Sequence, residues 1–166
     1  KDIVFDFYGN IVSIAPNVVK DDLPNLTKMI MESLEQSEDL QDDESLLFFS
    51  PAATCLKQIA RILPASLVSM SVAQEAIPYF LKLINFDESD KFSIQNMDFS
   101  DENSFKLAQS AAISCIITFF GYMPNTAQKL IEEPIFDFLF AYVTHSSNLV
   151  SIFDSIADSV QGFYFL

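Results

Sequence analysis

The chain has little glycine and little histidine, and each scarcity removes a class of site. Its 166 residues include three glycines, Gly9, Gly121 and Gly162, and no two lie close enough to form a phosphate-cradling loop. Sparse glycine is instead typical of a helical chain, because glycine destabilises helix interiors. His145 is the single histidine, whereas nucleophilic triads and most zinc sites need a histidine beside a nucleophile or further ligands.

The sequence also lacks the short motifs that mark common enzymes and metal sites. It contains no G-x-S-x-G, no H-E-x-x-H and no Walker loop. The acidic segments 87–92 and 98–103 begin like calcium loops but have no glycine at the sixth position, where an EF-hand loop must turn sharply. We therefore expect no enzyme activity and no catalytic, cofactor or metal site.

Positive charge is scarce. Nine basic residues stand against 23 acidic ones, which gives a formal net charge of −14. Such a surface repels nucleic-acid backbones and anionic membranes, so no direct nucleic-acid partner is expected. Two interpretations remain open, a surface that attracts basic partners and a surface whose charge serves solubility alone.

Long apolar runs are broken by polar residues, and no membrane span is expected. The segment 107–128 carries no formal charge, but it holds serine, threonine, asparagine and glutamine side chains that a hydrocarbon core does not favour. We expect it to be a central, covered helix. The first residues, 1–6, contain two acids and no long apolar core, so they do not resemble a signal peptide.

What the chain does contain is a nine-residue phrase that occurs three times and ends each time in proline. The copies are 8–16, 56–64 and 116–124. Cys55 and Cys115 both fall nine residues before their proline, and Phe7 holds that place in the first copy. Equivalent positions on an apolar face predict two buried thiols rather than a disulfide, which favours a reducing compartment.

Each copy is followed by a second proline, so the repeated unit is predicted to be helix, bend, helix. These prolines are Pro24, Pro78 and Pro134, with acids shortly before each of them, a pattern typical of helix starts. Self-similarity at about 40–50 residues indicates a helical-repeat array. We assign one all-α segment over 1–166, with hairpins at about 3–34, 45–86 and 103–144 and a partial one at 148–166.

Within these hairpins the helices are predicted by apolar residues at spacings of three and four. The expected pairs are 3–16 with 23–34, 45–64 with 72–86, and 103–123 with 125–144. The apolar stripe of the first pair's second helix contains Leu23, Leu26, Ile30 and Leu34. Two acidic runs, 35–45 and 87–102, connect one hairpin to the next. Loops at equivalent places in a stacked array emerge on one edge, so these runs should lie side by side.

The proline-ended first helices and the segment 105–112, Phe-Lys-Leu-Ala-Gln-Ser-Ala-Ala, resemble HEAT repeats, with Lys106 where that repeat carries an arginine. This resemblance implies a right-handed α-solenoid of about three and a half hairpins, and we expect the chain to be a segment of a longer array. The order of parts around 81–108 is similar to that in the importin-β superfamily of karyopherins.

The karyopherin resemblance implies a nuclear transport receptor segment, in the cytoplasm or nucleus, that binds basic cargo or a small GTPase. Its second helices would line the contact surface. The candidate partner-binding residues are Glu32, Asp42, Asp43, Glu44, Asp87, Glu88, Asp90 and Asp137. The alternative is a HEAT-repeat scaffold or assembly chaperone in another large complex, since a fold alone does not specify a function.

Overall fold

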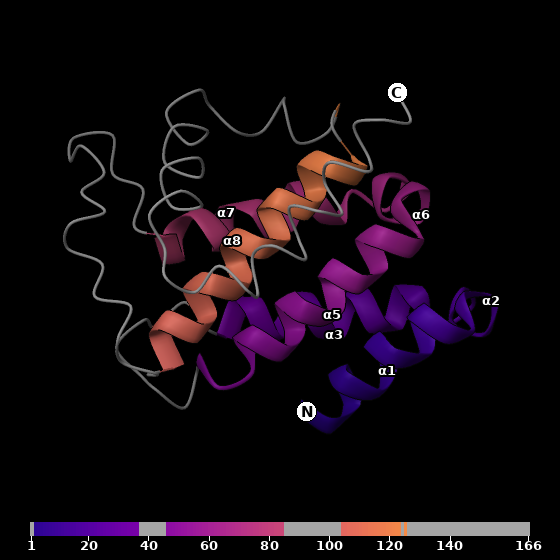
Figure 1. Cartoon of the computed structure of the whole chain (residues 1–166), viewed down its shortest axis with the longest axis horizontal. Coiled ribbons are helices and arrows are strands. Elements are labelled where there is room, and N and C mark those ends of the chain that lie inside the picture. Colours follow the sequence, from indigo (N-terminus) through magenta and orange to yellow (C-terminus); the bar gives the residue numbers. More distant parts are fainter. Residues whose placement is uncertain (1, 37–45, 85–103, 124, 126–166) are drawn as a thin grey trace.

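The structure is a computed structural model that describes residues 2–36, 46–84, 104–123 and 125 (Figure 1). Within these ranges it contains helices and no strand, so the all-α class is confirmed. The helices are α1 (Asp2–Ile14), α2 (Pro16–Val19), α3 (Leu23–Gln36), α5 (Phe49–Ile62), α6 (Pro64–Ser69), α7 (Val72–Ile84) and α8 (Ser104–Tyr122). The predicted helices 125–144 and 148–166, and the proline at position 134, lie outside the described residues.

The repeated phrase has the same backbone structure wherever it occurs. Each first helix ends two residues before its proline, at Ile14, Ile62 and Tyr122, because the proline ring disfavours helical dihedral angles in the residue between them. Ala15 has φ −140° and Leu63 has φ −129°. In all three copies the amide before the proline donates a 2.7 Å hydrogen bond to the carbonyl four residues earlier, namely Ala15 to Ile11, Leu63 to Ile59 and Met123 to Phe119.

Proline then starts a short helix at the bend. Pro16 and Pro64 are the first residues of α2 and α6, where a missing N–H costs nothing and the fixed φ suits the helix. These two bends carry the chain from the first helix of the hairpin to the second. In the first two copies, the sequence repeat is therefore a structural repeat of helix, short proline-started helix and helix.

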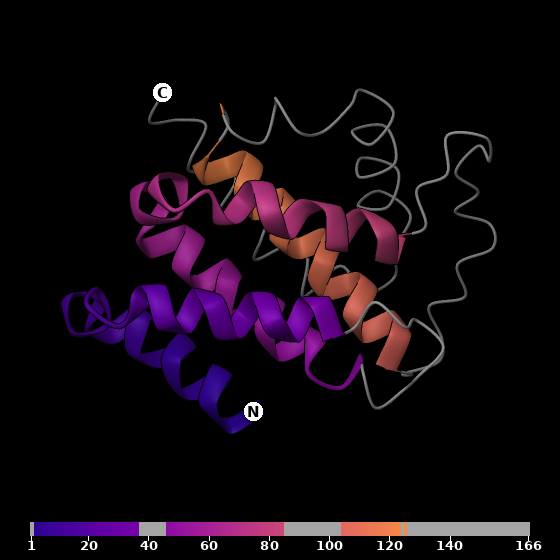
Figure 2. The same ribbon diagram turned by 180° about the vertical axis from the view of Figure 1, so that it is seen from behind.

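The hairpins are arranged in two layers. The first helices α1, α5 and α8 lie side by side in that order, with α5 packed against both of its neighbours (Figure 1). The second helices α3 and α7 pack against each other in the other layer, seen in front in Figure 2. Helix α3 also packs on α5, and α7 packs on α8. Each second helix thus contacts the first helix of the following hairpin.

The core lies between these layers. The predicted stripe of α3 is confirmed, since Leu23, Leu26, Ile30 and Leu34 are all buried. Aromatic rings continue the core from α5 through α7 to α8. Phe80 packs edge-on against Phe49 at 5.9 Å between ring centroids and lies 6.1 Å from Phe119.

Helix α8 is the covered helix that the uncharged segment predicted. Most of its described side chains are buried, including the polar Gln109 and Thr118. Gln109 Nε2 donates a 3.1 Å hydrogen bond to the carbonyl oxygen of Leu83, near the end of α7. On its other side, Lys57 Nζ of α5 donates to Ser114 Oγ at 3.2 Å. These contacts satisfy buried polar groups that would otherwise oppose folding.

The predicted start of the second helix at residue 72 is confirmed, since α7 begins at Val72. The interpretation of Pro78 as the residue that opens this helix is wrong, because Pro78 lies inside α7. The start is produced by Ser71, whose φ of 57° turns the chain out of α6. Glu75 lies in the first turn of α7, where a carboxylate complements the helix dipole.

Candidate functional site

Of the residues expected to contact a partner, the structure describes Glu32. The remaining candidates, Asp42, Asp43, Glu44, Asp87, Glu88, Asp90 and Asp137, lie outside the described residues. The helices that precede the two acidic runs, α3 and α7, run in the same direction and end on the same edge of the molecule (Figure 2). The adjacent placement of the two runs stays a prediction.

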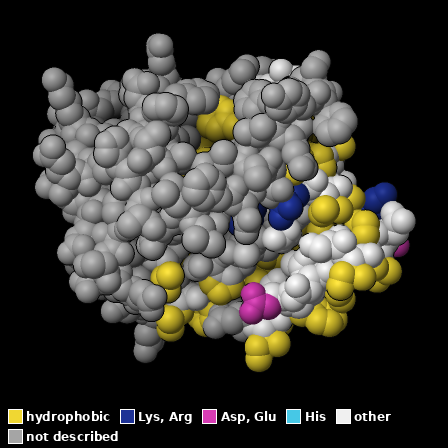
Figure 3. All heavy atoms as spheres, in the orientation of Figure 1, with side chains coloured by type: hydrophobic (Ala, Val, Ile, Leu, Met, Phe, Trp, Pro, Cys, Tyr) yellow, Lys and Arg dark blue, Asp and Glu magenta, His cyan; other side chains and the backbone are white. Residues whose placement is uncertain are grey.

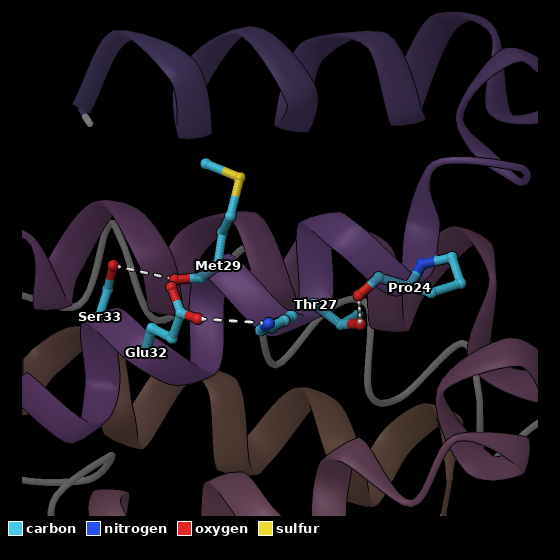
Figure 4. A network of polar contacts seen from close by, with 6 residues as sticks. Pro24, Thr27, Met29, Glu32 and Ser33 are labelled. Carbon is cyan, nitrogen blue, oxygen red and sulfur yellow. Dashed lines mark hydrogen bonds and ion pairs between the residues drawn. The ribbon is translucent and has the colours of Figure 1, made fainter.

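Glu32 is an exposed carboxylate with a partner on its own helix. Its side chain is 52% exposed, and its Oε1 lies 3.9 Å from Lys28 Nζ, one helical turn earlier. Figure 4 shows this pair beside two hydroxyls, of Thr27 and Ser33, that bond back to main-chain oxygens of α3. An exposed ion pair of this kind contributes less than about 1 kcal/mol to stability. Glu32 is thus a solvated charge, partly neutralised by Lys28.

A groove between α3 and α7 offers a more specific arrangement. It has a volume of about 470 Å³ and lies on the second-helix layer. Its lining residues are Met31, Glu35, Glu75, Pro78, Tyr79 and Lys82. The groove therefore combines an apolar thioether, a proline ring and a phenol with two carboxylates and one ammonium.

Helical spacing explains how these side chains meet. Met31 and Glu35 are four residues apart on α3, and Glu75 and Tyr79 are four apart on α7, so each pair lies on one helix face. The packing of α3 against α7 brings the two faces to one groove. Sequence reasoning noted Glu35 only as part of an acidic run and Glu75 only as a helix-start signal. No local pattern links them, because 40 residues separate the two positions.

The groove suits the side chain of a lysine or arginine. Such side chains lay their hydrocarbon stems on apolar surface while the cationic head stays in polar surroundings. Met31 and Tyr79 supply the apolar wall, and Glu35 and Glu75 supply two opposite charges, of which Lys82 offsets one. The phenol ring adds a surface that attracts cations.

The two thiols are buried, as the sequence predicted, and both are free. Burial raises the pKa of Cys55 to about 12, and the nearby Asp6 carboxylate adds to the increase. Burial also raises the pKa of Cys115, although Lys57 opposes that change. Thiols with raised pKa values are poor nucleophiles, because the thiolate is the reactive form.

Phe7 departs from this pattern. The sequence placed it on the same apolar face as the two cysteines, but it is 58% exposed. The reason is the position of α1 at the end of the row of first helices. Helix α1 covers the face of α5 that carries Cys55, and α5 packs on α8. Phe7 lies on the side of α1 that faces away from α5, so α5 does not cover it.

Over residues 2–36, 46–84, 104–123 and 125, no three histidine, cysteine, aspartate or glutamate side chains lie where they could hold a metal ion. His145 is outside these ranges. Among the helices that the structure describes, none has both the length and the apolar character that a membrane crossing requires.

Comparison with known protein families, with curated proteins and with solved structures gives no match to this chain.

Proposed function

We propose that this chain is a non-catalytic protein-interaction scaffold that binds a basic segment of a partner along its second-helix layer. The observation that carries the proposal is the groove between α3 and α7, which Glu35 of one helix and Glu75 and Tyr79 of the other all line. The net charge of −14 supports it, because long-range attraction speeds the encounter with a basic partner.

The proposed architecture is a right-handed α-solenoid of HEAT-like hairpins. Its support is the repeated proline bend together with the two layers, in which each hairpin packs on the next. Solenoids of this kind use extended surfaces built from successive repeats for binding. A groove formed between the second helices of two neighbouring hairpins fits that use.

The more specific proposal is a segment of a nuclear transport receptor that binds basic cargo or a small GTPase in the cytoplasm or nucleus. It rests on the karyopherin resemblance and on the acidic surplus. The alternative is a scaffold or assembly chaperone of another complex. The two proposals differ in how long the partner stays bound. A transport receptor releases basic cargo readily, whereas a scaffold keeps one partner in fixed stoichiometry.

The test of the groove is binding of a fluorescent lysine-rich peptide to the whole chain, followed by anisotropy at several salt concentrations. We expect the double variant Glu35→Gln/Glu75→Gln to bind about tenfold more weakly, since two exposed charge pairs of up to about 1 kcal/mol each are lost. A peptide with norleucine in place of lysine should not bind.

The matched control removes the same number of charges elsewhere. The double variant Asp6→Asn/Asp21→Asn changes two exposed carboxylates outside the groove. It should bind the peptide within about twofold of the unaltered chain, because distant exposed charges are screened. Equal losses in both double variants would mean that net charge alone attracts the peptide, and the groove assignment would be wrong.

A further inference from the structure

Helix α1 is apolar on two opposite faces, and one of them is exposed. Its inner face, with Phe5, Gly9 and Val12, is buried. Its outer face carries Ile3 at 83% exposure and Ile14 at 84%, with Phe7 between them. Figure 3 shows hydrophobic side chains gathered over this part of the molecule, at the lower right. An exposed apolar face of this kind is typical of an interaction surface, so the outer face calls for a partner.

The internal repeat shows what covers the position of Phe7 in the neighbouring helices. Counted from the proline, Phe7 of α1 is equivalent to Cys55 of α5 and Cys115 of α8. Both cysteines are buried, and Phe7 is not. Burial also increases from α1 to α8 at the position three residues later. There Asn10 is exposed, Gln58 is half-buried and Thr118 is fully buried.

The cover in α5 is the preceding first helix. Phe5, Asp6, Gly9 and Asn10 of α1 lie around Cys55. A Cβ atom placed on Gly9 would lie 3.9 Å from the Cα atom of Cys55, so the small residue lets the two backbones approach closely. The interface is therefore built from a bulky apolar residue, a glycine and a second apolar residue at spacings of four and three.

We propose that the outer face of α1, formed by Ile3, Phe7 and Ile14, docks an amphipathic helix that repeats the inner-face pattern of α1. The docked helix continues the row of first helices α1, α5 and α8, so the new contact extends an interface that the fold already uses twice. Its own flanks are neutral or basic, because Asp6 is exposed on α1 and the chain carries a net charge of −14. That same charge disfavours a second copy of this chain as the occupant.

This inference is independent of the groove between α3 and α7, which lies on the other layer. The probe is a hydrocarbon-stapled fluorescent peptide that keeps Phe5, Gly9 and Val12 of α1 and carries lysine at its outward positions. Its binding to the whole chain is measured by anisotropy. A peptide with Gly9→Leu is the matched control for close backbone approach, and it should bind about tenfold more weakly.

The protein variants test the face itself. Phe7→Ser/Ile14→Ser should weaken binding about tenfold or more, since the apolar area buried on docking is lost. Phe7→Leu should keep most of it, and Val68→Ser, which changes an exposed apolar residue on α6, should leave binding unchanged. The midpoint of thermal unfolding should stay the same in all three protein variants, because each altered side chain is largely exposed.

Three results would overturn the proposal. The first is no saturable binding of the stapled peptide to the unaltered chain, and the second is equal binding to the chain and to Phe7→Ser/Ile14→Ser. The third is a dimer in sedimentation that Phe7→Ser/Ile14→Ser dissociates, since the face would then be covered by a second copy and not by a partner helix.

Discussion

Tyr8 on α1 donates a hydrogen bond from Oη to Oδ2 of Asp22, in the turn that leads into α3. Asn25 Nδ2 donates to the other oxygen of the same carboxylate at 3.2 Å. The contact spans the bend at Pro16 and joins the two layers of the first hairpin. It also perturbs both groups: the hydrogen bond from Tyr8 and then that from Asn25 lower the pKa of Asp22, and the bond to Asp22 raises the pKa of Tyr8.

These two pKa shifts predict how the contact responds to pH. Because the folded pKa of Asp22 is lowered, its contribution is present above the ordinary carboxyl pKa of about 4 and is lost as pH falls through the folded value. The raised pKa of Tyr8 adds stability that is present below about pH 10 and lost as pH rises through the folded value. Tyr8→Phe should therefore lower the urea midpoint at pH 7 and have a smaller effect at pH 3. An equal effect at both values would show that the hydroxyl acts only through packing.

Phe119 is the side chain whose truncation should cost most. It is fully buried in α8 and contacts the ring of Phe80, so Phe119→Ala should reduce the free energy of unfolding by about 3–5 kcal/mol. Ile14→Ala is the control, because that side chain is exposed and should change stability by less than about 0.5 kcal/mol. Urea unfolding followed by circular dichroism measures both. Similar small effects would contradict the assignment of α8 to the core.

Ser71 offers a change that should stabilise the chain. Its φ of 57° is a left-handed value that costs a non-glycine residue about 1–2 kcal/mol. Ser71→Gly removes that cost but adds entropy to the unfolded chain, so a net gain of about 0.5–1 kcal/mol is expected. The gain should appear as a higher urea midpoint with an unchanged slope. Ser71→Val should lower the urea midpoint, because a β-branched residue is disfavoured at a positive φ. If Ser71→Val raised the midpoint, the left-handed conformation of residue 71 would be contradicted.

The cysteines should resist modification while the chain is folded. Burial raises the pKa of Cys55 to about 12 and that of Cys115 also rises, so almost no thiolate is present at pH 8. An aromatic disulfide reagent should release no thiolate product from the native chain and two equivalents in urea. Rapid release of one equivalent before unfolding would show that a cysteine is accessible.

Local sequence patterns were sufficient for the described first and second helices of the hairpins and for the ends of the first helices near proline. Leu23, Leu26, Ile30 and Leu34 recur at helical spacing, and the residue before each proline must leave the helical region. Both rules act within a few residues, so they hold before any tertiary contact forms. The same rules predicted a helix from residue 72, where α7 begins, but they also read Pro78 as a first-turn residue, and Pro78 lies inside α7.

The sequence alone also determined the burial of Cys55 and Cys115, since each occupies a repeated place on an apolar face. Only the tertiary structure decided that Phe7, at the same place, is exposed, because exposure depends on whether another helix packs there. The groove also depends on tertiary structure, because Glu35 and Glu75 line one surface only through the packing of α3 on α7. A helix carries its pattern in its own residues, whereas a surface shared by two helices depends on side-chain packing between segments far apart in the chain.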